Sequence, residues 1–170
     1  MPTFYSPEGN SEVWDKKPDG YITVDEYVAL QEAEYNTLEN VAARKLVEID
    51  EQTSMTILNG FMYNIDDVDY HFSYDAFDQQ NFSDSANMAN IIKAGGTSTI
   101  TTVFWNAYKD WDGEKGTLVR IELDVDKFLD LYVNGALLHK STIMAEGGDR
   151  KDALAVAVAN KVPLDEIEVI

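Results

Sequence analysis

The chain has 170 residues, no cysteine and 31 acidic against 13 basic side chains, which gives a formal net charge of -18. This charge repels nucleic acid phosphates and anionic lipid head groups, so we expect no nucleic acid or membrane partner. The first residues lack the basic and apolar pattern of a leader peptide, and no apolar run is long enough to span a bilayer. We therefore expect one domain with an arm, made in a cytoplasm.

Residues 1–22 form the first predicted region, an extended segment. Proline, glycine, asparagine and serine punctuate two aromatic patches, Thr3–Tyr5 and Val13–Trp14, which predict short strands. Asp15 to Glu26 resembles a calcium-binding EF-hand loop, because acidic residues open and close it and Asp-Gly fills its fifth and sixth positions. The candidate calcium ligands are Asp15, Asp19, Tyr21, Thr23 and Glu26.

A structural role is the alternative interpretation of this loop. Lys17 occupies the third ligand position, where calcium needs an oxygen and where a cation opposes the charge of the ion. Gly20 suits a turn, and Thr23 with Glu26 matches a capping box, in which each side chain bonds the backbone N–H of the other residue. The same residues therefore predict a helix that starts near Val24.

Residues 23–59 are the second predicted region, a single long helix or arm that Asn59-Gly60 ends. At the standard rise per residue it would be roughly 50 Å long. Polar residues interrupt any strict heptad, which favours an arm or a helix packed along its own domain over a dimeric or trimeric coiled coil. The apolar stripe of this helix contains Leu30, Leu38, Val41, Ala42, Leu46, Ile49 and Ile57.

Residues 60–170 form the third predicted region, a compact α+β domain. Alternating apolar residues predict a hairpin over residues 61–74 with its turn at Asp66-Asp67, then an amide-rich corner, then a helix over Ser83–Lys93. A second hairpin covers residues 98–123.

The rest of the third region is predicted to be mainly helical. Asp124 caps a helix that Gly147-Gly148 end, Asp149 starts a short helix that Pro163 stops, and residues 164–170 form a last strand or lie over the surface. The predicted fold class is therefore α+β, with a long N-terminal helix and two antiparallel hairpins that form a small sheet packed by two to three helices.

The sequence has no nucleophile beside a base and no phosphate-binding loop, so we expect neither an enzyme nor a cofactor. His71 and His139 have no ligand spacing around them and are interpreted as surface or satisfied core residues. Trp105, Tyr108 and Trp111 lie beside the second hairpin, where they predict either a platform for a sugar or a partner protein, or core packing.

The segment Ile57–Phe82, followed by VFWNAY, LVRIEL, FLDLYVNGALLHKSTIM and GGDRKDAL, resembles an uncharacterised domain family of tailed bacteriophages and prophages. Members are found at the C-terminal end of tail-fibre proteins and in small proteins encoded beside them. The likeness covers about Leu46 to Val158, and residues 4–27 are similar to the leader segments of the small free-standing members. The acidic turn IDDVD, residues 65–69, departs from the plainer turn of the family.

The resemblance implies a non-enzymatic structural protein of a phage tail, as a tail-fibre, baseplate or tail-tip accessory subunit that attaches to other tail proteins. Its location would be the virion, and the host cytoplasm during assembly. A homo-oligomer through the long helix, a fibre assembly chaperone absent from the mature virion, and a calcium-dependent host-surface or glycan-binding module are the alternatives. The predicted partner-binding residues are Phe4, Tyr5, Trp14, Leu38, Val41, Ile49, Trp105, Tyr108 and Trp111.

Overall fold

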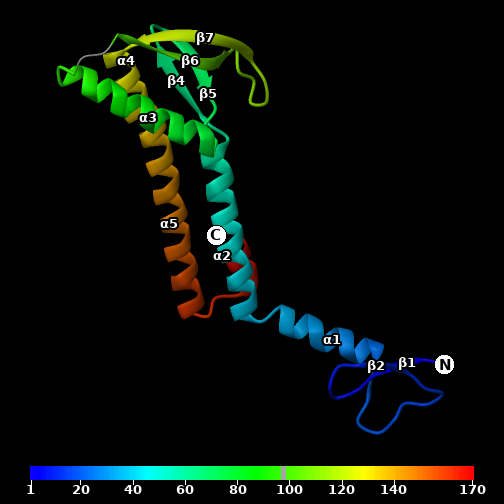
Figure 1. Cartoon of the computed structure of the whole chain (residues 1–170). Coiled ribbons are helices and arrows are strands. Elements are labelled where there is room, and N and C mark those ends of the chain that lie inside the picture. The colour runs from blue at the N-terminus through cyan, green and yellow to red at the C-terminus, as the bar shows by residue number, and fades with distance from the viewer. Residues whose placement is uncertain (97–98) are drawn as a thin grey trace. The chain divides into compact units, whose positions relative to one another are not determined.

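A computed structural model describes residues 1–96 and 99–170 (Figure 1). The contacts between these residues divide the chain into two compact units. Unit 1 comprises residues 1–48 and 152–170, and unit 2 comprises residues 49–151. The helices α2 (Leu38–Leu58) and α5 (Leu138–Ala159) each contribute residues to both units. The predicted boundaries after residues 22 and 59 stay a prediction.

Unit 1 contains a small antiparallel sheet with the strand order β2-β1-β3. Phe4 is buried in it, and the ring of Tyr5 stacks on Tyr27 with 3.7 Å between centroids. The capping box of Thr23 and Glu26 is confirmed. The bounds are β1 (Thr3–Tyr5), β2 (Ser11–Val13), β3 (Ile22–Thr23), α1 (Val24–Tyr35) and α6 (Leu164–Glu168).

The predicted fold class is wrong in its architecture, because the N-terminal helix is not continuous. It breaks between α1 and α2, where the Thr37 hydroxyl accepts the Asn40 N–H at 3.3 Å and so caps the second helix. The Asn40 amide in turn donates to the Glu34 carbonyl at 2.7 Å. These short side chains offer the backbone alternatives to helical hydrogen bonds, which is why the helix ends here. The predicted stop after α2 is confirmed, since Gly60 has φ +82°.

Unit 2 contains a four-stranded antiparallel sheet with the order β4-β5-β6-β7. Both predicted hairpins are present, and the pair His71–Tyr108 joins them into one sheet. The turn residues Asp66 and Asp67 both have positive φ, as a type I′ turn requires. Position 98, where the second hairpin is predicted to start, lies outside the described residues. The strands are β4 (Phe61–Ile65), β5 (Val68–Phe72), β6 (Thr102–Lys109) and β7 (Thr117–Asp124).

The helices of unit 2 correct two further expectations. The predicted amide-rich corner is helical, because Asp75 accepts the Asp78 N–H at 2.8 Å and caps α3 (Ala76–Lys93). The predicted helix end at Gly147-Gly148 is wrong, because α5 continues to Ala159. Gly147 faces Thr53 on α2, so it serves close helix packing. Between β7 and α5 lie α4 (Val125–Asp130) and the π-helix η1 (Leu131–Leu137).

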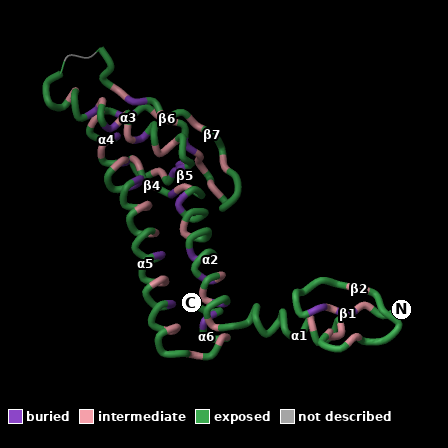
Figure 2. Tube along the Cα trace, turned by 60° about the horizontal axis from the view of Figure 1, so that its bottom comes forward, coloured by how far each residue is buried: buried purple, intermediate pink, exposed green. Residues whose placement is uncertain are grey.

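The main core lies in unit 2, between one face of the sheet, α3 and the α4–η1 segment (Figure 2). Phe72, Phe82 and Phe128 are fully buried in it. Burying one such side chain contributes about 1.5–3 kcal/mol relative to leaving it exposed. Phe82 contacts rings on both the sheet and the helices, which fixes α3 against the sheet.

Gly135 in η1 packs so closely against Phe61 that a side chain would not fit without a shift. A Cβ atom there would lie 2.7 Å from Cε2 of Phe61, so we expect Gly135→Ala to lower the free energy of unfolding by about 1–3 kcal/mol. Urea titration measures the change. Gly148→Ala is the control, because Gly148 also lies inside a helix but faces open space. Alanine favours the helix over glycine, so this change should raise the free energy of unfolding by about 0.5–1 kcal/mol. Equal effects of the two changes would contradict this packing.

Candidate functional site

Several of the residues predicted to bind partners are instead buried against other residues of the chain. Phe4, Val41 and Ile49 are buried, and Leu38 is half-buried. Trp14 is 46% exposed, and its indole N–H donates to the Glu12 carboxylate at 3.0 Å. Of the predicted N-terminal attachment residues, Trp14 thus presents the largest accessible apolar surface.

The helix α1 carries a further exposed apolar surface. None of its twelve residues is buried, and the side chains of Val24, Val28, Leu30 and Tyr35 are 40–58% exposed. A helix in a folded protein normally buries one apolar stripe. The sequence contained this signal, because the apolar residues of α1 do not gather on one face.

The calcium-like loop places its last acidic residue in the helix cap. The carboxylate of Glu26 accepts the Thr23 N–H at 2.8 Å and the Lys17 ammonium at 3.3 Å. The Thr23 backbone bond, followed by Lys17, lowers the pKa of Glu26. No group of three or more acidic or histidine side chains converges on one point in residues 1–96 and 99–170. The geometry supports a capping role, and calcium binding stays a prediction.

The predicted aromatic platform is split between the two faces of the sheet. Trp111 stacks on His71 with 3.9 Å between centroids, and the Tyr108 ring lies 5.5 Å from Trp111. Trp105 points to the other face, where its ring lies 4.1 Å from Phe82. Side chains of successive strand residues alternate between faces, so Trp105 and Tyr108, three positions apart, separate.

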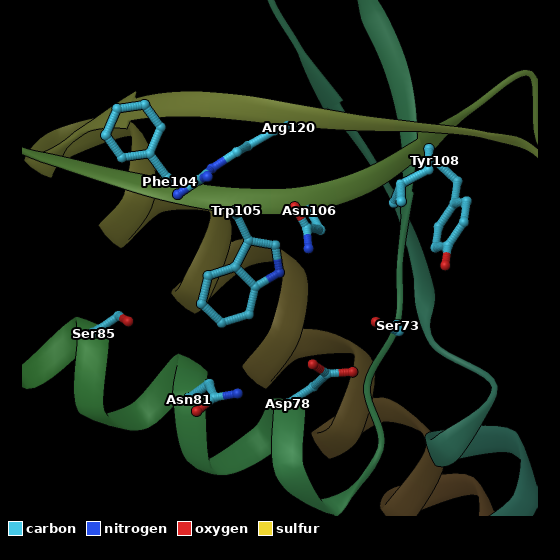
Figure 3. A pocket seen from close by; sticks show the side chains of 10 residues that line it. Ser73, Asp78, Asn81, Ser85, Phe104, Trp105, Asn106, Tyr108 and Arg120 are labelled. Atoms are coloured by element: carbon cyan, nitrogen blue, oxygen red, sulfur yellow. The ribbon is translucent and has the colours of Figure 1, made fainter.

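An open cleft lies between β6 and α3 (Figure 3). It has a volume of about 590 Å³ and exists because β5 and β6 diverge beyond the pair His71–Tyr108, after which the chain turns into α3. Trp105 extends from β6 toward α3, with Asn81 and Asp78 opposite it (Figure 3). The polar lining consists of Ser73, Asp78, Asn81, Ser85, Asn106 and Arg120.

The cleft presents polar groups that the protein itself does not use. Within the described part of the chain, the side chains of Asp78, Asn81, Ser85 and Asn106 make no hydrogen bond to another protein group. Three of them, Asp78, Asn81 and Ser85, lie on α3 at helical spacing, beside the buried positions 82, 86 and 89. Arg120 differs, since its guanidinium lies over the Phe104 ring, 4.9 Å from the centroid.

The two histidines cap the end of α2, a role that sequence spacing did not reveal. Nε2 of His71 lies 2.9 Å from the Asn59 carbonyl oxygen, and Nε2 of His139 lies 3.0 Å from that of Ile57. Carbonyls in the last turn of a helix lack helical partners, so these contacts satisfy them. The donor role of Nε2 makes Nδ1 of His71 an acceptor, and that atom is buried without a partner among the described residues.

A scan against protein-family models, a search of curated proteins and a search of solved structures each find no match. The likeness to phage tail proteins therefore stays a prediction. Among the helices of the described residues, none combines the length and apolarity that crossing a membrane requires.

His71 should make stability depend on pH. Burial lowers the pKa of His71 from 6.5 and the charge of His139 lowers it further, although the Asn59 carbonyl raises it. Below pH 6.5 the unfolded chain then binds more protons at this residue than the folded chain, so stability falls as pH falls toward the folded pKa. Urea unfolding of wild type and His71→Gln from about pH 7.5 to 5.5 should show a smaller loss in the variant. Parallel pH profiles would contradict this role.

Proposed function

We propose that the chain is a non-enzymatic structural subunit of a bacteriophage tail that attaches to other tail proteins. The likeness of residues 46–158 to tail-region domains supplies the context, and α1 supplies the observation that carries the proposal. A helix that exposes Val28, Leu30 and Tyr35 and buries no residue gains stability when a partner covers these side chains.

Charge supports the same role. Acidic residues on α1, including Asp25, Glu32 and Glu34, surround its exposed apolar side chains, and the whole chain carries -18. Such a surface keeps an unattached subunit soluble and favours a partner with a more basic surface, because opposite potentials steer association. The partner surface should therefore combine apolar pockets with lysine and arginine at their rim.

The double variant Val28→Ser, Leu30→Ser tests attachment. Serine has a helix propensity similar to that of valine and only about a few tenths of a kcal/mol below that of leucine, and the capping box is untouched, so α1 should persist in circular dichroism spectra. Loss of two apolar contacts, each worth at least about 1.5 kcal/mol, should weaken attachment tenfold or more. Mass spectrometry of purified particles, assembled with wild-type or variant chain, measures incorporation.

Val156→Ser with Val169→Ser is the matched control, because both valines are exposed and lie outside α1. It should be incorporated like the wild type. A wild-type chain that takes part in assembly but is absent from purified particles would contradict the structural role and support an assembly chaperone instead. Equal incorporation of the α1 variant and the wild type would contradict attachment through α1.

A further inference from the structure

We propose that the cleft between β6 and α3 binds a saccharide of one or two rings. The proposal goes beyond attachment to the tail, since the attachment helix α1 belongs to unit 1 and the cleft to unit 2. A volume of about 590 Å³ lies within the range of small-molecule sites. The ligand class follows from the chemistry of the groups in the cleft.

The polar groups in the cleft match hydroxyl groups. A sugar hydroxyl both donates and accepts hydrogen bonds, and a carboxamide offers two donors and one acceptor in a plane. Asn81 faces the cleft from α3, and Asn106 lines its rim from the face of β6 opposite Trp105, so a bound ring would meet one amide inside the cleft and one at its edge (Figure 3). Asp78, beside Asn81, adds an acceptor. These side chains have no hydrogen-bonding partner in the described protein, so a ligand would not have to displace an internal bond.

Trp105 supplies the apolar part of the site. The side of its ring near Phe82 is covered, with 4.1 Å between centroids, and the indole is only partly buried and lines the cleft. The C–H groups of a sugar ring are apolar and can lie against an aromatic ring, while hydroxyls at the rim reach polar neighbours. Figure 3 shows the indole between β6 and α3, with Asn81 and Asp78 opposite.

An extended peptide is the competing occupant, because β6 exposes a strand edge where β5 diverges from it. Peptides that add to a sheet need pockets for their alternate side chains. Polar side chains provide six of the ten lining residues, which suits a ligand rich in hydroxyls better than apolar peptide side chains. We therefore assign the saccharide.

The experiment begins with the full wild-type chain on a printed array of bacterial and eukaryotic oligosaccharides. The saccharide with the strongest signal is then titrated calorimetrically against wild type, Asn81→Ala and Asn106→Ala. Each amide removal should weaken binding about tenfold or more, because its partner hydroxyls lose a bond in the cleft. Asn90→Ala is the matched control, since Asn90 is exposed on the same helix but does not line the cleft. It should bind like wild type, and all three variants should keep the wild-type melting temperature.

Three results would overturn the proposal. They are no saccharide bound by the wild type, equal loss of binding in Asn90→Ala and Asn81→Ala, or peptide binding that protects β6 amides without saccharide binding. The Val28→Ser, Leu30→Ser variant separates this proposal from tail attachment. It should bind the saccharide with unchanged affinity, so failure at the cleft leaves attachment through α1 standing, and failure of attachment leaves the cleft standing.

Discussion

The contact of Phe82 with the sheet is the interaction on which unit 2 depends. This fully buried side chain of α3 meets rings of Phe72 and Trp105 on the sheet and of Phe128 on α4. It holds the helix close to β6 on its apolar side. The neighbouring polar positions of the same helix then line the cleft, so one helix both completes the core and forms a wall of the candidate site.

The two units differ in how far they bury their apolar side chains. Unit 2 buries aromatic residues such as Phe72, Phe82 and Phe128 in one core, whereas α1 in unit 1 leaves all its apolar side chains at least partly accessible. A helix without buried residues gains little from tertiary packing, which provides most helical stability in proteins. The capping box of Thr23 and Glu26 supports its first turn, and a partner that covers Val28 and Leu30 would supply the missing packing.

Local hydrogen-bonding signals in the sequence predicted much of the fold, and contacts between distant residues explain what they missed. The capping box, the Asp66-Asp67 turn and the Gly60 stop depend on neighbouring residues and are confirmed. The break at Thr37 is also local, since its hydroxyl accepts the Asn40 N–H, but this cap inside the predicted helix was not considered. Helix α5 continues through Gly147, whose lack of a side chain leaves room for Thr53, far away in sequence. The cleft arises from the divergence of β5 and β6, which no residue pattern encodes.

Hydrogen exchange of the free chain and of the chain in purified tails tests the central claim, attachment through α1, most directly. The amides of Val24–Tyr35 should exchange quickly in the free chain, where no side chain of α1 is buried, and slowly in the particle. Core amides of β5 should be protected in both states. Rapid exchange of α1 in the particle, equal to that in the free chain, would contradict attachment through this helix.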